Sequence, residues 1–287
     1  LDGVTGVQTC ALPISSMLVE TIRQDMIANN LANVDTVGYK RDQGVFKELP
    51  TMVLNRVNDG QLYPPRPFEN APKIGKVGTG VILDESYTDF SLGKLQYTDN
   101  ELDCALENAK AFFLMETPNG IRYSRDGVFT MNQDGYLTNM NGDFVMAEPE
   151  PPRNIEDRLL VAQDGTPNAA LDIGRVQVGP TDKITLDTEG RVLVNGAPRF
   201  RLVRGMASDR KAFRKENTNN FTRAYGDVQR ADGKVKIGYV EKPNFSLVEE
   251  MVKMIEVSRA YEANSKCIQA HDSLLDKVVN SVGPTRR

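Results

Sequence analysis

The chain of 287 residues contains no tryptophan and a single histidine, His271. Sites built from several histidines are therefore excluded, and with them many hydrolase and oxygenase mechanisms. No stretch approaches the roughly 20 apolar residues that cross a bilayer, so we expect no membrane insertion. Neither sign of charge dominates, because 35 Lys and Arg residues stand against 39 Asp and Glu residues. This balance disfavours a nucleic-acid-binding protein and is typical of a folded domain.

The three cysteines do not form a reactive or metal-binding pattern. Cys267 and His271 are four residues apart on a predicted helix, but they supply two strong ligands where a catalytic zinc ion usually needs three. Cys104 and His271 are the one thiol and imidazole pair suited to nucleophilic catalysis. Cys104, however, lies in an alternating apolar segment that is typical of a buried strand. The glycines of residues 75–80 do not follow the GxGxxG spacing of a phosphate loop. We predict no catalytic residue, no cofactor and no metal ion, and therefore no enzyme.

Basic residues are concentrated between residues 199 and 215. The segment contains one acid, Asp209, and seven bases: Arg199, Arg201, Arg204, Arg210, Lys211, Arg214 and Lys215. A phosphate-binding patch is one interpretation. Because no regularly spaced aromatic residues accompany the bases, we favour a solvated face or a contact with an acidic protein partner.

A long helix is predicted at the C-terminus, because residues 246–280 contain neither glycine nor proline. Apolar residues recur every seven positions at Leu247, Met254, Tyr261, Ile268 and Leu275, and Val248, Met251, Val252 and Ile255 widen this face at its start. The row three positions later is interrupted by Glu250, Asn264 and His271. A helix of about 35 residues is about 50 Å long. Since a small globule cannot cover such a helix, we expect a partner helix.

A candidate partner is the N-terminal segment, where apolar residues recur at helical spacing from Val19 to Val34 until Gly38 ends the pattern. Its polar face carries Asn29, Asn30 and Asn33. Asparagine is a mediocre helix former, so we expect these amides to meet specific partners, with a frayed helix end as the alternative.

Between the two helices, Asn-Gly and Asp-Gly pairs indicate strands joined by tight turns. Such pairs at 119–120, 126–127, 134–135 and 141–142 are spaced as in a β-meander. We therefore predict a mixed, mainly β protein: a β-rich domain at 75–240, an extended proline-rich connector at 39–74, and coiled-coil-like pairing of the helices at 16–38 and 241–281, followed by a tail at 282–287. Residues 4–15 resemble the translation of a sequencing adapter, so we exclude residues 1–15 as non-native.

Three blocks of the sequence resemble the flagellar rod and hook family, most closely its basal-body rod proteins of the FlgF/FlgG type. The first, at residues 25–40, contains Ala28-Asn29-Asn30-Leu31-Ala32-Asn33. The second runs from Gly93-Lys94-Leu95 through Phe112-Phe113 to Tyr123-Ser124-Arg125-Asp126-Gly127. The third joins Gly238-Tyr239-Val240-Glu241 to Arg259-Ala260-Tyr261-Glu262-Ala263-Asn264.

The resemblance implies a structural axial subunit of the bacterial flagellar basal-body rod that polymerises through its terminal helices and transmits torque. Its partners would be other rod subunits, further copies of itself and the flagellar export apparatus. It would reach the periplasm-spanning rod without a cleaved signal peptide. We expect a proximal, FlgF-like position, with a distal FlgG-like or hook-type subunit as alternatives. A secreted β-rich binding or adhesion protein is the competing class.

We expect assembly to depend on residues of the two terminal helices. These are Met26, Asn29, Asn30, Leu31, Asn33, Leu247, Met254, Tyr261, Asn264, Ile268 and Leu275. In the isolated subunit the asparagine amides should be hydrated, because the end helices have little to pack on.

Overall fold

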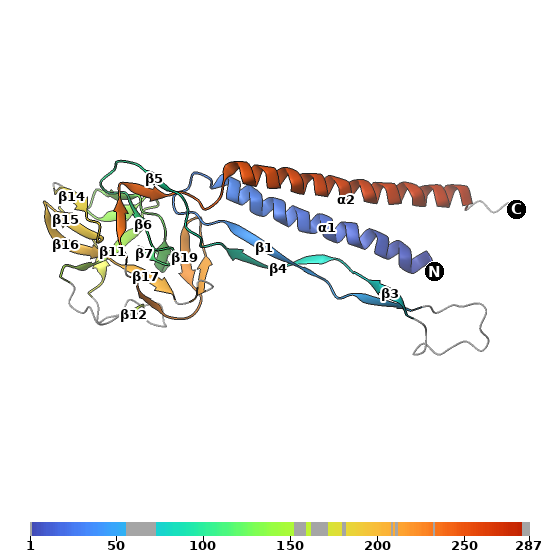
Figure 1. Cartoon of the computed structure of the whole chain (residues 1–287), viewed down its shortest axis with the longest axis horizontal. Helices are drawn as coiled ribbons and strands as arrows, with labels where there is room; N and C mark the ends of the chain where they lie inside the picture. The colour runs from blue at the N-terminus through green and yellow to red at the C-terminus, as the bar shows by residue number, and fades with distance from the viewer. Residues whose placement is uncertain are drawn as a thin grey trace. The chain divides into compact units, whose positions relative to one another are not determined.

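A computed structural model of the chain describes residues 2–55, 73–151, 159–161, 172–179, 182–207, 209, 212–231 and 233–282. The described residues form two long helices, α1 (Asp2–Ala32) and α2 (Leu247–Val282), with 22 strands between them (Figure 1). The prediction of a mainly β chain with a long helix at each end is confirmed. No helix in these ranges is long and apolar enough to cross a membrane.

The chain folds into two compact units. The first consists of Leu1–Asn29, Gln43–Tyr87 and Val248–Arg287, and the second of Asn30–Asp42 and Thr88–Leu247. The first unit therefore combines most of both terminal helices with an arm of short strands. The second unit contains the β-rich middle of the chain together with the segment that follows α1.

The arm is built from two strand pairs. β1 (Asp42–Glu48) pairs with β4 (Val81–Thr88), and β2 (Met52–Asn55) pairs with β3 (Lys73–Val77) in antiparallel register. The described part of the expected connector at 39–74 is thus largely in paired strands. The prolines Pro64, Pro65 and Pro67 lie outside the described residues.

Helix α1 differs from the prediction at both ends. It begins at Asp2, so it includes the adapter-like residues, and it contains Pro13. It ends at Ala32 rather than near Gly38. The backbone N–H of Asn33 donates to the carbonyl oxygen of Asn30 (3.0 Å), which replaces the helical hydrogen bond with a tight turn. Gly38 has another role: its φ is +72°, and a Cβ there would collide with the backbone of Arg125.

The main sheet of the second unit follows the strand order β12-β20-β17-β7-β11-β16-β15-β14, with further strands branching from this path. The strands of this unit are β5 (Leu95–Tyr97), β6 (Cys104–Leu106), β7 (Phe112–Thr117), β8 (Gly120–Ser124), β9 (Phe129–Met131), β10 (Leu137–Asn139), β11 (Phe144–Pro149), β12 (Leu159–Val161), β13 (Gly174–Arg175), β14 (Ile184–Leu186), β15 (Arg191–Val194), β16 (Ala197–Leu202), β17 (Arg204–Ala207), β18 (Phe213–Lys215), β19 (Asn220–Arg223), β20 (Val228–Arg230), β21 (Val235–Ile237) and β22 (Tyr239–Glu241).

The predicted meander is correct for three of its four turns. Hairpins join β7 to β8, β9 to β10 and β10 to β11. The turn predicted at residues 126–127 does not form a hairpin, because β8 pairs with β19 and β11 pairs with β7. Gly127 instead lies against the backbone of Cys104, where a Cβ would collide with the carbonyl oxygen. Close packing of two backbones therefore explains this glycine.

The side chains of β7 alternate between two hydrophobic clusters, as expected for a strand buried on both faces. Phe113 and Met115 belong to a cluster with Cys104, Phe129 and Leu137. Phe112 and Leu114 belong to a second cluster, which also contains Phe90, Tyr123, Phe213 and Phe221. The rings of Phe112 and Phe213 have centroids 4.6 Å apart, and those of Phe90 and Phe221 are 5.1 Å apart. Such pairs add about 0.5–1.5 kcal/mol each beyond the burial of apolar area.

Candidate assembly site

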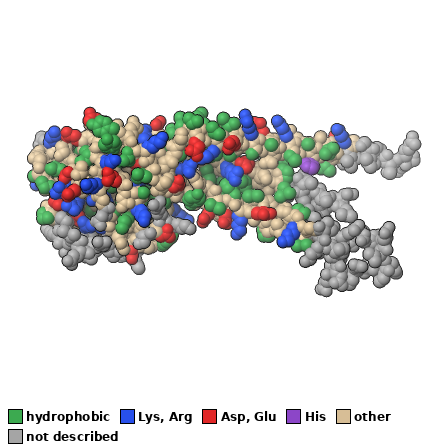
Figure 2. Space-filling view, in the orientation of Figure 1, with side chains coloured by type: hydrophobic (Ala, Val, Ile, Leu, Met, Phe, Trp, Pro, Cys, Tyr) green, Lys and Arg blue, Asp and Glu red, His purple; other side chains and the backbone are tan. Residues whose placement is uncertain are grey.

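Helix α2 begins with a row of exposed apolar side chains. Their exposed fractions are 44% at Leu247, 68% at Val248, 49% at Met251 and Val252, and 53% at Ile255. We call these five residues the α2 apolar face. Hydrophobic side chains gather over the N-terminal half of α2 in Figure 2. A contiguous exposed apolar patch of this kind marks an interaction surface.

The row of α2 that was predicted to be its apolar seam is not its most buried row. Of the predicted residues, Met254 and Ile268 are half-buried, whereas Leu247, Tyr261 and Leu275 are exposed. The polar-interrupted row is more buried: Glu250 is 1% exposed and Val257 is 8% exposed. Asn264 and His271, which continue this row, are half-buried. Burial of Glu250 is offset by the Lys253 ammonium, which lies 3.0 Å from its carboxylate.

Helix α1 packs partly on the arm. Met26, which is half-buried, lies close to Gly44 of β1 and Leu83 of β4, because a Cβ added to Gly44 would lie 3.1 Å from the Met26 sulfur and 2.9 Å from Leu83. The Arg23 guanidinium stands 4.3 Å from the centre of the Phe46 ring. The arm therefore covers part of α1. Leu12, Ile14 and Leu18 remain exposed.

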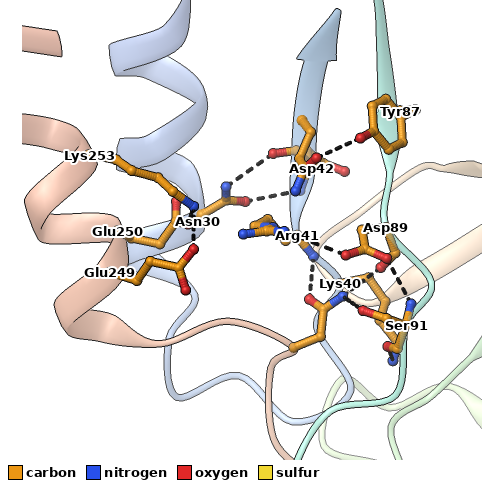
Figure 3. Close-up of polar contacts among 12 residues, drawn as sticks. Asn30, Lys40, Arg41, Asp42, Tyr87, Asp89, Ser91, Glu249, Glu250 and Lys253 are labelled. Atoms are coloured by element: carbon orange, nitrogen blue, oxygen red, sulfur yellow. Dashed lines mark hydrogen bonds and ion pairs between the residues drawn. The ribbon is translucent and has the colours of Figure 1, made fainter. Parts of the chain in front are cut away.

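The Asn30 side chain is bonded within the subunit, so the expectation that its amide is hydrated is wrong. Asn30 is 2% exposed, and its Nδ2 donates to the carbonyl oxygen of Asp42 (3.1 Å). Its Oδ1 accepts hydrogen bonds from the Tyr39 hydroxyl (3.0 Å) and the Asp42 N–H (3.1 Å). Figure 3 shows the two hydrogen bonds between Asn30, near the end of α1, and Asp42, at the start of β1. Asn33 and Leu31 are half-buried, and Asn33 accepts a hydrogen bond from the Thr36 hydroxyl. Asn29 is exposed.

A buried ion cluster joins three distant parts of the second unit. The Lys40 ammonium lies 2.5 Å from one oxygen of Glu241, and the Arg125 guanidinium lies 3.3 Å from the other. Each of the three side chains is at most 1% exposed. Gly93 donates its N–H to Glu241, and Lys40 donates to the carbonyl oxygen of Ser91. Burial lowers the pKa of Lys40, and the Glu241 carboxylate opposes this shift.

Backbone contacts around this ion cluster hold together the segments that follow α1 and precede α2. The Gly38 N–H donates to the carbonyl oxygen of Glu241 (2.8 Å), and the Arg41 N–H donates to Asn244 Oδ1 (3.0 Å). Asn244 in turn donates to the carbonyl oxygen of Asp89 (2.8 Å). We call this region the junction. It anchors the chain beside both helix termini at one place in the β-rich unit.

The sequence did not predict the junction as a site. Lys40, Arg125 and Glu241 are far apart in the chain, and no spacing rule relates them. The one available signal is that each of them lies in a different one of the three family-like blocks. Removal of Glu241 would leave two buried cations, a change that costs about 3–5 kcal/mol in comparable buried pairs.

The two cysteines considered in the sequence for catalysis or metal binding lie in different environments. Cys104 is fully buried, and burial raises its thiol pKa, whereas Cys267 is exposed. Over the described ranges, no group of three or more His, Cys, Asp or Glu residues is placed to hold a metal ion.

Three of the seven bases of the basic segment are engaged within the subunit. Arg201 pairs with Glu150 (2.9 Å), and Lys215 pairs with Asp42 (2.8 Å). Arg204 donates to the backbone carbonyl oxygen of Gly233. Arg199 and Arg214 are exposed. Arg210 and Lys211 fall outside the described residues. A continuous phosphate-binding patch is therefore not favoured.

The exposed apolar face at the start of a long helix indicates a protein that binds other protein chains. Residues 17–40 match the family described as "Flagella basal body rod protein", residues 236–281 match "Flagellar basal body rod FlgEFG protein C-terminal", and residues 108–194 match "Flagellar hook protein FlgE/F/G D1 domain". These regions contain Lys40, Glu241 and Arg125, respectively.

Several relatives match the chain over nearly its whole length. The flagellar basal-body rod protein FlgG of Buchnera aphidicola (subsp. Schizaphis graminum) is 31% identical over 90% of this chain and 94% of its own length. The hook-basal body complex protein FlhO of Bacillus subtilis is 28% identical over 94% of this chain and 96% of its own length. The flagellar basal-body rod protein FlgF of Caulobacter vibrioides is 28% identical over 90% of this chain and 91% of its own length. The chain belongs to the flagellar basal-body rod proteins of the FlgF/FlgG type and is a structural subunit of the rod.

Proposed function

We propose that this rod subunit polymerises through its paired terminal helices and transmits torque along the rod. The observation that carries the proposal is the α2 apolar face, where five apolar side chains at the start of one helix are 44–68% exposed. Burial of a valine- or isoleucine-sized side chain contributes about 1.5–3 kcal/mol. A neighbouring subunit that covers this face would therefore gain substantial binding free energy. A head-to-tail contact whose rotation does not close produces a helical filament.

The junction supports the second part of the proposal. A subunit that transmits torque needs its chain to be held firmly where it enters and leaves the β-rich unit. The ion pairs of Lys40 and Arg125 with Glu241 are buried and further braced by backbone hydrogen bonds. Their loss would expose unpaired charges to an apolar interior, so the arrangement resists opening.

The proximal, FlgF-like position remains our prediction, and the distal, FlgG-like position remains the alternative. Relatives of both kinds match the chain at similar identity. Delivery by the flagellar export apparatus without a cleaved signal peptide is likewise part of the proposal. The comparisons favour the rod over the alternative of a secreted adhesion protein.

A charge placed in the α2 apolar face tests the polymerisation proposal. We expect Val252→Asp to leave the thermal unfolding of the isolated subunit within about 1 °C, as for other exposed positions. The same variant should reduce incorporation into isolated basal bodies, measured by quantitative immunoblotting, at least about tenfold, because a carboxylate would be buried in an apolar contact.

Glu256→Gln, a change at another exposed position of α2, is the matched control and should incorporate normally. Normal incorporation and motility of Val252→Asp would contradict the proposal. The proposal would also be contradicted if the unmodified chain were absent from isolated basal bodies.

A further inference from the structure

A pocket opens in the second unit where four turns meet. Its volume is about 640 Å³. Asn33 and Thr36 reach it from the turn after α1, residues 117–119 from the β7–β8 turn, Asn141 from the β10–β11 turn, and residues 216–219 from the β18–β19 turn. We call it the four-turn pocket. It is lined mainly by asparagine, threonine and charged side chains, so it suits a polar ligand.

Asn220, which lines the pocket, carries a buried hydrogen-bond acceptor that has no partner among the described residues. Asn220 is 4% exposed, and its Nδ2 donates to Asp143 Oδ2 (2.9 Å). Its Oδ1 has no hydrogen-bond partner in the described structure. An unmatched buried carbonyl oxygen is costly, so such an atom is typically satisfied by a bound group.

Uncompensated carboxylates lie beside this acceptor. Asp143 is 9% exposed and accepts amide hydrogen bonds from Asn139 and Asn220, but it forms no ion pair with any described residue. Asn219, which lines the pocket, donates to Asp126 (3.1 Å). Asp126 is a second buried carboxylate, and it forms no ion pair with a described residue. Among the described residues that line the pocket, Arg122 is the one cation, and it pairs with Glu216 (3.0 Å). The pocket therefore favours a positively charged ligand that carries several N–H donors.

A guanidinium group has this chemistry. It presents five N–H donors on a planar head, and its aliphatic stem can pack on apolar atoms at a pocket entrance. Pro118 and Met140, in the turns that form the pocket, are exposed, with Met140 at 71%. The volume exceeds what a single metal ion would fill, so the geometry favours an inserted side chain.

Arg199 is placed to supply this group from a second copy of the chain. It is exposed and forms no ion pair with any residue of the described part, in contrast to its neighbour Arg201, which is held by Glu150. Asp143 and Arg199 lie near opposite ends of β11. Asp143 immediately precedes this strand, and the carbonyl oxygen of Arg199 accepts a hydrogen bond from the N–H of Glu150, which immediately follows it. The six residues of β11 separate the two by about 20 Å. Within the β-rich unit of Figure 1, β16 and β19 lie at opposite ends. A donor and an acceptor at opposite ends are what a head-to-tail contact requires.

We propose that Arg199 of one subunit inserts into the four-turn pocket of the next copy, where its guanidinium donates to Asp143 and, after a small displacement of the side chains that cover it, to Asn220 Oδ1. The contact rests on the proposed function, because two copies meet in this way only in the assembled rod. It adds a polar, register-setting contact between β-rich units to the apolar contacts of the helices.

Cross-linking in isolated basal bodies tests the contact. Arg199→Cys and Asn119→Cys are combined in a chain that also carries Cys10→Ser and Cys267→Ser, and a short bis-maleimide reagent is added. We expect a ladder of covalently linked subunits on denaturing gels. Each single-cysteine variant should give none. Arg214→Cys combined with Asn119→Cys is the matched control and should give no ladder either, because β18, which contains Arg214, is next to the pocket turn.

Arginine substitutions provide a second measurement. Arg199→Ala should lower incorporation into basal bodies at least about tenfold, as expected for loss of a buried charged hydrogen bond. Arg214→Ala should have no effect, and neither arginine variant should change subunit unfolding. A chain that incorporates normally but gives no 199–119 cross-link overturns this contact and leaves the proposed function intact. A chain that is absent from basal bodies overturns both.

Discussion

Two buried carboxylates of the β-rich unit are stabilised in different ways. Glu241 is surrounded by two cations and a backbone N–H. Asp126 accepts hydrogen bonds from the Val128 N–H (3.0 Å) and the Asn219 amide (3.1 Å), and it forms no ion pair with a described residue. Because burial outweighs these bonds, the pKa of Asp126 is raised from 3.8 to about 6. The carboxylate of Asp126 is therefore a cost to stability at neutral pH.

This shift predicts how stability depends on pH. The folded protein holds the Asp126 proton more tightly than the unfolded chain does, so the contribution of Asp126 to the free energy of unfolding is greatest below pH 4. This contribution to the free energy of unfolding falls by about 3 kcal/mol as the pH rises from about 4 through about 6. We expect Asp126→Asn to lose this decrease, which urea unfolding between pH 4.5 and 7.5 would measure. Identical pH profiles for the variant and the unmodified chain would show that Asp126 does not carry the dependence.

At the scale of single elements, the two terminal helices use asparagine differently. Asn30 lies in the last turn of α1, where it ties the helix end to β1 through both directions of hydrogen bonding with Asp42. Asn264 lies in the row of α2 that also contains Glu250 and Val257, and it is half-buried. The first asparagine therefore serves subunit folding. For the second, a role in assembly remains a prediction.

Substitutions should separate these roles. Asn30→Ala removes one donor and one acceptor and leaves buried partners unsatisfied, which costs about 1–3 kcal/mol for each unsatisfied group. We expect its thermal unfolding midpoint to fall by several degrees. Asn264→Leu should change the midpoint by no more than about 1 °C and impair motility.

The assignment of roles would be wrong if Asn264→Leu lowered the midpoint by several degrees. It would also be wrong if Asn30→Ala left the midpoint unchanged. Circular dichroism melting of the purified subunit and a soft-agar motility assay provide the two measurements.

At the scale of the whole molecule, segments from the two ends of the chain are brought to one junction. Gly38 and Arg41, after α1, bond to Glu241 and Asn244, before α2. Residues of both helices also belong to the same compact unit. Ile22 and Ile268, on the two helices, are both half-buried. These observations support the proposal that the helices pair along their length.

Disulfide scanning tests the pairing. A cysteine at Ile22 is combined with single cysteines along residues 260–275, and a cysteine at Ile268 with single cysteines along residues 15–30, in a Cys10→Ser, Cys267→Ser background. We expect disulfides at a subset of positions with helical periodicity, because the bond needs Cα atoms about 4.4–6.8 Å apart. Non-reducing gels and peptide mass spectrometry would detect them. Absence of disulfides across both scans would contradict helix pairing.

The local pattern of the sequence determined the elements of this protein. The uninterrupted C-terminal segment predicted a helix that forms at Leu247–Val282, and the Asn-Gly and Asp-Gly pairs predicted the turns of three hairpins. Both signals act between residues a few positions apart, so they can be recognised without knowledge of the fold. The apolar residues at the start of α2 were recognised for the same reason, and their exposure agrees with the expectation that the end helices have little to pack on.

Tertiary structure decided how these elements combine. The pairing of β8 with β19, the close approach that requires Gly127, and the burial of Asn30 all depend on partners that periodicity does not identify. The clearest case is the ion cluster of Lys40, Arg125 and Glu241. Buried charges are tolerated only when opposite charges meet them, and only the tertiary fold brings these three together. Tertiary structure also decided which row of α2 is buried, because Glu250 and Val257 are buried whereas the more apolar face with Val252 and Ile255 stays exposed.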